Sequence, residues 1–273
     1  MLQVAPITLP EADALPGEIA LSVQNLSAGY AGMRPAVEQV SFNVLVGERV
    51  AVIGPNGAGK STLFKAIVGL LPFNSGSISI HGQDCRTSHN LVGYVPQHEA
   101  VDWSFPATVY DAVMMGRTRK IRRILGPSRD DHQGVQEALS KVGLMPFRNR
   151  QIGQLSGGQK RRVFIARALA QETNVLLLDE PFSGVDAAAE HEIMETLDLL
   201  QAAGITMLLA THDLNMAATR FDRLLLLRRH VVAYGMPEAV FQPDLLQEAY
   251  GGRIGVFQQG TQTVVIADEH GCP

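Results

Sequence analysis

Short apolar runs alternate with segments that have apolar residues at helical spacing along most of the 273-residue chain. The predicted strands are residues 19–26, 37–45, 49–53, 76–80, 91–95, 175–178, 205–210 and 224–227. The predicted helices among them are residues 61–70, 187–203 and 213–220. Between Gln97 and Ser156 the pattern changes to helices without strands, at residues 108–115 and 131–142. Strands that alternate with helices predict an α/β fold with a mostly parallel sheet covered on both faces.

The sequence after the predicted strand 49–53 matches the phosphate-binding pattern G-x-x-x-x-G-K-S. The matching residues and the next helical residue are Gly54, Pro55, Asn56, Gly57, Ala58, Gly59, Lys60, Ser61 and Thr62. Glycines let such a loop direct backbone N–H groups at phosphates, and the helix adds the positive end of its dipole. We expect Lys60 to bind the β and γ phosphates of ATP and Ser61 to bind Mg²⁺. A glycine-rich turn without a ligand is the alternative, and the flanking strand and helix disfavour it.

Two acidic residues, Asp179 and Glu180, follow the apolar strand 175–178. We expect Asp179 to bind magnesium, directly or through water, and Glu180 to act as the general base that activates the attacking water. A solvated turn is the alternative for an Asp-Glu pair. The four apolar residues that lead into it favour the catalytic interpretation.

The pentapeptide LSGGQ at residues 155–159 resembles the signature of the ABC ATPase family. Apolar residues at helical spacing after it predict a helix with Ser156 as the N-cap. The resemblance implies that Ser156, Gly157, Gly158 and Gln159 of one copy contact the γ-phosphate held by the loop of a second copy. Two copies would therefore pair head to tail around ATP.

Four further residues match the family's pattern in its order along the chain. The resemblance implies that Gln97 senses magnesium and water, that Asp186 crosses the dimer interface and that His212 hydrogen-bonds the γ-phosphate. It also implies that Tyr30 stacks on adenine. Taken alone, His212 would be a structural histidine at a strand end and Tyr30 a packing residue in a turn; their order and spacing favour the functional interpretation.

The resemblance extends from about residue 19 to residue 250 and implies a P-loop NTPase fold. It implies a mostly parallel core sheet, an N-terminal antiparallel β part and an inserted helical subdomain at about residues 98–172. We expect a single ATPase domain at residues 18–250. Residues 1–17 would form a loose tail, and residues 251–273 a C-terminal tail with a strand candidate at residues 264–266.

The overall composition disfavours several classes of protein. The chain has 23 basic and 27 acidic residues and a net charge of −4, which provides no global field for attracting nucleic acid. Its two cysteines, Cys85 and Cys272, cannot build a framework of disulfides. No apolar run approaches the roughly 18 to 20 residues that span a bilayer. We expect a cytoplasmic protein without a nucleic-acid partner.

Basic residues cluster in one short run, at Arg117, Arg119, Lys120, Arg122 and Arg123. A solvated face is the favoured interpretation. Attraction to anionic lipid headgroups beneath a membrane partner is the alternative.

The segment at residues 101–117 is similar to the ATPase subunits of manganese, zinc and iron importers. The similarity implies an integral membrane permease that docks beside Gln97, a solute-binding protein that acts on the permease, and a peripheral position on the inner face of the cell membrane. Trp103, Phe105 and Pro106 either form the docking surface or pack inside the helical subdomain. The eight histidines show no metal-ligand spacing, so magnesium is the only ion that we expect on the chain.

Two alternatives to metal import remain open at this point. One is a soluble ABC ATPase without a membrane partner, acting in cofactor assembly. The other is an importer subunit for haem, a siderophore or another solute.

Overall fold

A six-stranded sheet forms the centre of the protein in the computed structural model, which describes residues 17–88, 91–97, 105–121, 126–251, 254–259 and 262–267. In spatial order its strands are β10 (His230–Gly235), β9 (Arg223–Arg228), β3 (Arg49–Ile53), β8 (Thr206–Ala210), β7 (Val175–Asp179) and β6 (Val92–Val95). All neighbouring pairs except β9 and β10 are parallel. The predicted mostly parallel sheet is confirmed.

The central strands are buried on both faces, as parallel strands covered by other layers must be. Every residue of β3, β7 and β8 is buried. Successive side chains of β3 point into two different cores: Ala51 and Ile53 pack with the helices on one face, while Val50 and Val52 pack with α1 (Lys60–Ile67) and a second sheet. The period of two along a strand therefore divides the apolar residues between two layers.

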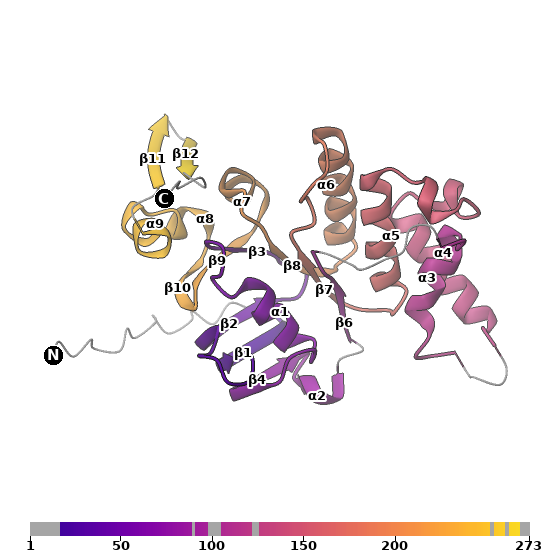
Figure 1. The fold of residues 1–273 in the computed structure, drawn as a ribbon, viewed down its shortest axis with the longest axis horizontal. Coiled ribbons are helices and arrows are strands. Elements are labelled where there is room, and N and C mark those ends of the chain that lie inside the picture. The colour runs from indigo at the N-terminus through magenta and orange to yellow at the C-terminus, as the bar shows by residue number, and fades with distance from the viewer. Residues whose placement is uncertain are drawn as a thin grey trace.

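The second sheet is antiparallel and lies beside α1, at the bottom of Figure 1. Its strands, in spatial order, are β2 (Val37–Leu45), β1 (Ile19–Ala28), β4 (Phe73–Ile80) and β5 (Gln83–Asp84), followed in the chain by α2 (Cys85–Ser88). The predicted N-terminal antiparallel part is confirmed. Sequence reasoning did not predict β10, which connects the two sheets: the hydroxyl of Tyr234 donates to the carbonyl of Asn43, and its ring lies 5.9 Å from that of Phe42.

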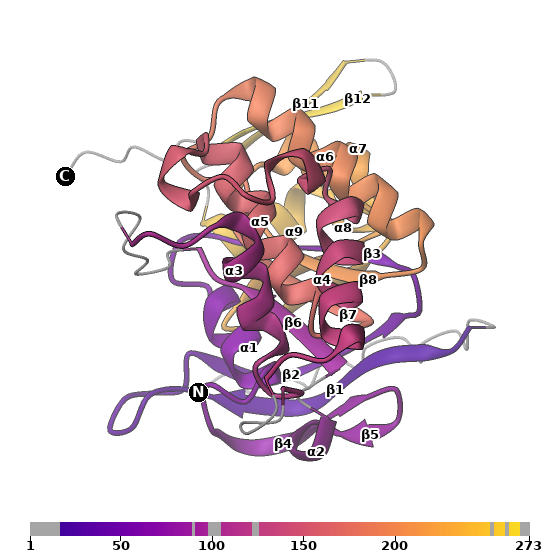
Figure 2. The ribbon, with the colours of Figure 1, turned by 90° about the vertical axis from the view of Figure 1, so that its right-hand side faces the viewer.

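Three helices, α3 (Val109–Met114), α4 (Arg129–Lys141) and α5 (Gly157–Leu169), pack on one another in a helical lobe. We use this name for the described residues 105–121 and 126–169. The lobe lies at the right of Figure 1 and faces the viewer in Figure 2. Short 3₁₀ turns complete it: η2 (Met115–Arg117), η3 (Met145–Phe147) and η4 (Ile152–Gln154). Each of the three α-helices begins with a capping box, which satisfies the backbone N–H groups of its N-cap and N3 residues.

The remaining elements follow the signature helix. They are α6 (Ala187–Ala202), α7 (Leu214–Arg220), α8 (Pro237–Val240), α9 (Pro243–Tyr250), β11 (Ile254–Gln259) and β12 (Gln262–Ala267). β11 and β12 form an antiparallel hairpin, so the strand candidate at residues 264–266 is confirmed and acquires a partner. None of the helices formed by the described residues is long and apolar enough to cross a membrane.

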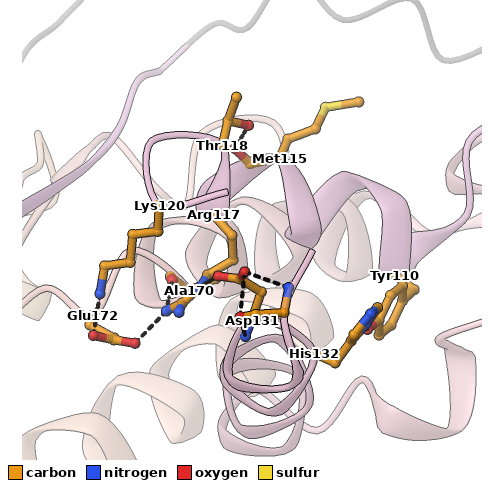
Figure 3. A network of polar contacts seen from close by, with 10 residues as sticks. Tyr110, Met115, Arg117, Thr118, Lys120, Asp131, His132, Ala170 and Glu172 are labelled. Carbon is orange, nitrogen blue, oxygen red and sulfur yellow. Dashed lines mark hydrogen bonds and ion pairs between the residues drawn. The ribbon is translucent and has the colours of Figure 1, made fainter. Parts of the chain in front are cut away.

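The basic run does not form an evenly solvated face, because Arg117 is only 3% exposed. Its Nε donates to Asp131 Oδ1 at 2.9 Å, and its Nη1 donates to the carbonyl of Ala170 at 3.1 Å and to Glu172 (Figure 3). Lys120 also pairs with Glu172. Two carboxylates thus compensate the burial of Arg117, and the expectation of a solvated face is wrong for that residue. Arg122 and Arg123 lie outside the described residues.

We predict that Asp131→Asn lowers the free energy of unfolding by about 3 kcal/mol at pH 7, because it removes the buried one of the two carboxylates that compensate Arg117. Hydrogen bonds from Ser128, followed by the Arg117 charge, lower the pKa of Asp131 to about 2. An aspartate with a pKa of about 4 when unfolded therefore stabilises the native state above pH 4, and this contribution is lost as the pH falls towards 2.

Urea unfolding between pH 2 and pH 7 measures both effects. The matched control is Asp130→Asn, since Asp130 is the exposed neighbour in the same first turn of α4. Equal losses of stability in the two variants would contradict the assignment of a buried ion pair.

Candidate functional site

The phosphate-binding loop connects β3 to α1, as the sequence predicts. Glycine is required at both ends of the loop. Gly54 has a φ of 152°, and a Cβ there would lie 2.1 Å from the carbonyl oxygen of Leu227; Gly59 has a φ of 103°, and a Cβ there would lie 2.5 Å from Val37 Cγ1. Gly57 also has a positive φ, 79°, but has open space around it. Close packing therefore requires glycine at Gly54 and Gly59, whereas at Gly57 only the positive φ favours it.

Lys60, the lysine of the loop motif, is buried and held by the loop itself. Its Nζ donates to the carbonyl oxygens of Gly54 at 2.7 Å and Pro55 at 3.3 Å. The N-cap of α1 is Gly59, whose lack of a side chain leaves that helix end without a side-chain cap, and the first turn contains no acidic residue. A helix end of this kind, next to a lysine, is suited to an anion.

Asp179 is the last residue of the buried strand β7, and it is itself buried. The hydroxyl of Tyr94, on the neighbouring strand β6, donates to Asp179 Oδ2 at 3.3 Å. Burial, and then the charge of Asp179, raise the pKa of the Tyr94 hydroxyl above its ordinary value. Sequence reasoning did not identify Tyr94, although it faces the same side as Asp179 once β6 and β7 are aligned in parallel.

Glu180 follows at the point where the chain leaves the sheet, and it adopts a φ of 46°, which is rare for a residue with a side chain. Its backbone N–H donates to the carbonyl of Ala210 on β8 at 3.0 Å. The Gln97 side chain, just beyond β6, donates from Nε2 to Glu180 Oε2 at 2.5 Å. Nδ1 of His212, just beyond β8, lies 3.9 Å from the same oxygen. Three residues from three different strand ends therefore meet at one carboxylate.

The residues at this carboxylate differ in exposure. The Glu180 side chain is 14% exposed, whereas that of His212 is 51% exposed. Tyr30 is also exposed, and its hydroxyl lies 3.3 Å from Nζ of Lys65 on α1, which places it beside the loop helix.

The signature pentapeptide begins α5, with Ser156 as its N-cap, as predicted. The Ser156 hydroxyl accepts from the N–H of Gln159 at 3.2 Å, and the Gln159 side chain accepts from the N–H of Ser156 at 3.1 Å. A Cβ on Gly158 would lie 2.7 Å from Cβ of Ala189, so glycine is needed here for α5 to approach α6. The structure places α5 in the helical lobe and α1 beside the antiparallel sheet, well separated in Figure 1.

Asp186 lies close to this region at the start of α6. It is the N-cap residue of that helix, and its Oδ1 accepts from the N–H of Ala189 at 2.8 Å. Arg161, on the signature helix, also reaches the strand ends that carry Gln97 and Glu180, and sequence reasoning did not identify it. Among the residues whose placement the structure describes, no group of three His, Cys, Asp or Glu side chains could hold a metal ion. Trp103 lies outside those residues.

A glycine loop between a buried parallel strand and a helix, with its lysine turned into the loop, defines a P-loop nucleotide-binding protein. The profile of the ABC transporter family matches residues 37–183. The chain is 45% identical to a manganese transport system ATP-binding protein of Bacillus subtilis, over 92% of this chain and 98% of the relative. It is 44% identical to a zinc transport system ATP-binding protein of Treponema pallidum, over 89% and 92% of the two chains.

The fold agrees with these sequence relationships. A solved ATP-binding cassette of an ABC transporter in its ADP conformation matches with a TM-score of 0.74 and 26% identity, covering 86% of this chain and 99% of that one. The chain belongs to the ABC transporter family and is an ATP-binding cassette ATPase.

We predict that Gly54→Ala destabilises the protein by more than about 3 kcal/mol, because the added methyl group meets the Leu227 backbone, which cannot move without disturbing β9. Gly57→Ala is the matched control: it meets no neighbour and should cost only about 1 kcal/mol, the strain of a positive φ. Thermal unfolding of the two variants measures the difference. Equal melting temperatures would show that packing does not fix the loop.

Proposed function

We propose that this chain is the ATP-hydrolysing subunit of an ABC importer that powers uptake of a transition-metal ion, manganese, zinc or iron. The observation that supports hydrolysis most directly is the contact of Gln97 and His212 with one carboxylate, Glu180, at the sheet edge that also carries the phosphate-binding loop. The cargo rests on the manganese and zinc transport systems of the two relatives and on the similarity of residues 101–117 to importer subunits, iron importers included.

ATP is proposed to bind along the loop, at residues 54–62. Lys60 would exchange its loop carbonyl partners for the β and γ phosphate oxygens, and Tyr30 would stack on adenine. Ser61, Gln97 and Asp179 would hold magnesium; hydroxyl, amide and carboxylate oxygens are the ligands that this ion prefers, so the donor set fits. Bound there, the ion would neutralise charge on the β and γ phosphates.

In the proposed reaction, a water molecule attacks the γ-phosphorus and the bond to the bridging oxygen of ADP breaks. Glu180 accepts the proton of this water as the general base. Gln97 orients the carboxylate through the 2.5 Å hydrogen bond, and His212 donates to the γ-phosphate from its exposed side. The products are ADP and inorganic phosphate.

One copy of the chain supplies only part of this site. Ser156, Gly157, Gly158 and Gln159 begin a helix of the helical lobe, and Asp186 is exposed beside them, so we propose that they meet the nucleotide of a second, head-to-tail copy. Closure around two ATP molecules and reopening after hydrolysis would then move the two lobes.

Transport also requires a membrane partner. We propose an integral membrane permease that docks on the helical subdomain, residues 98–172, and a solute-binding protein that delivers the ion to it. Phe105 and Met115 of this region are large apolar side chains that are more than half exposed, which favours docking over internal packing for Phe105. The chain would lie on the cytoplasmic face of the membrane as the single ATPase domain 18–250, with residues 1–17 and 251–273 as tails.

We predict that Glu180→Gln lowers kcat for ATP hydrolysis by about a hundredfold while leaving ATP affinity within a few-fold, because the amide cannot accept the proton of the attacking water. Phosphate release and fluorescent-nucleotide binding measure the two quantities. Glu195→Gln on α6 is the control, since Glu195 is well exposed and pairs with His191. Normal turnover of Glu180→Gln would refute its assignment as the base.

The cargo prediction concerns the complete transporter reconstituted in vesicles. We expect ATP-dependent uptake of manganese, zinc or iron, and none when the ATPase subunit carries Glu180→Gln. Haem and a siderophore serve as competing solutes in the same assay. Uptake of one of these solutes without metal-ion uptake, or copurification of the chain only with soluble proteins, would overturn the metal-importer assignment.

A further inference from the structure

Arg161 lies in the second turn of the signature helix and reaches out of the helical lobe to the central sheet. Its Nη1 donates to the carbonyl of Pro96 at 3.0 Å and lies 3.4 Å from that of Gln97. Its Nη2 donates to the carbonyls of Asp179 at 2.9 Å and Glu180 at 2.8 Å. One guanidinium group therefore contacts the backbone at the ends of two neighbouring strands.

Those carbonyls belong to the places where β6 and β7 leave the sheet, so continued strand pairing cannot satisfy them. The last parallel pairs are Val95 with Leu178 and, on the other side of β7, Asp179 with Ala210. Parallel strands lie about 4.8 Å apart, a gap that the two Nη groups of a planar guanidinium can bridge and a lysine ammonium cannot bridge with the same geometry.

The contacts matter because the same residues carry the candidate reacting groups. Glu180 needs an unusual φ of 46°, and its backbone is held on one side by the carbonyl of Ala210 and on the other by Arg161. Gln97, whose side chain bonds to Glu180 at 2.5 Å, has its own backbone within reach of the same guanidinium. Because hydrogen bonds weaken steeply away from their preferred geometry, this contact is sensitive to displacement of either backbone.

We propose that Arg161 is a positioning residue that aligns Glu180 with Gln97 from the signature helix. The inference rests on the proposed function, since it assigns Arg161 an action through the general base. Arg161 itself touches neither nucleotide nor water in this scheme. The alignment requires one guanidinium group to bind the ends of both strands at once. A lysine has the same charge but a different shape, so it does not align the two residues.

Arg161→Lys tests this alignment in the purified full chain. We expect kcat for ATP hydrolysis to fall about tenfold and the affinity for a fluorescent ATP analogue to stay within about twofold, because two charge-assisted hydrogen bonds to the Glu180 strand end are lost and no nucleotide contact is removed. Arg162→Lys is the matched control. Arg162 is the adjacent arginine of the same helix and binds the carbonyl of Val142 and the carboxylate of Glu192, away from the strand ends. Its kcat should stay within about twofold of the wild type.

The double variant Arg161→Lys with Glu180→Gln separates positioning from general weakening of the fold. A residue that acts through Glu180 has nothing left to align when the base is absent, so the double variant should hydrolyse ATP no more slowly than Glu180→Gln alone. Arg161→Gln serves as a second variant should the lysine protein not fold.

The outcomes distinguish this inference from the proposed function. Suppose that Glu180→Gln hydrolyses ATP slowly. If kcat of Arg161→Lys is then within twofold of the wild type, the positioning role of Arg161 is refuted and the base assignment stands. The same conclusion follows if the double variant is a further tenfold slower than Glu180→Gln alone. A selective loss of ATP affinity in Arg161→Lys refutes it equally. If Glu180→Gln turns over normally, the base assignment falls and the positioning role falls with it.

Discussion

The carboxyl-terminal edge of the parallel sheet is the constraint on which the site depends. Parallel strands all release their chains at the same edge, so side chains from distant parts of the sequence are brought together there without any special device. β3 leads into the phosphate-binding loop, β6 into Gln97, β7 into Asp179 and Glu180, and β8 into His212. The parallel pairing of β6, β7 and β8 sets which residues end the strands side by side, and it thereby brings Gln97 and His212 to Glu180.

Two arginines fix the helical lobe in different ways. Arg117, on η2 directly after α3, pairs with Asp131 of α4 and with Glu172 of the chain after α5, and so ties these three segments together. Arg161 instead leaves the lobe and binds the strand ends. The proposed closure of two copies requires a lobe that moves as a unit; these contacts hold the lobe together internally and join it to the sheet near Glu180, the proposed general base.

Much of the fold follows from local rules that are visible in the sequence. The alternation of strands and helices predicts the parallel sheet, and the loop motif predicts its own strand and helix because Gly54 and Gly59 have no room for a side chain. The pattern did not predict β10, since its residues are mostly half-buried and show no clear alternation. The sequence pattern also predicted a solvated face that includes Arg117, which is in fact buried. A run of basic residues does not reveal which of them pairs with a carboxylate elsewhere in the chain.

The grouping of Gln97, Glu180 and His212 was predictable from the resemblance to the ABC ATPases, whereas Tyr94 and Arg161 were not identified. Tyr94 requires the alignment of β6 with β7 before its hydroxyl can be placed near Asp179. Arg161 binds backbone carbonyls, which every residue has, so no pattern of residue types identifies its partners.

The sheet edge of one copy holds the loop and the carboxylates, while the serine turn of the signature helix lies in the separate helical lobe. The proposal that a second copy completes the site is tested most directly by specific ATPase activity as a function of protein concentration, with sedimentation of the same samples. The predicted result is an activity per molecule that rises with concentration in step with the dimer. A constant activity per molecule, maintained at dilutions where only monomers sediment, would contradict it.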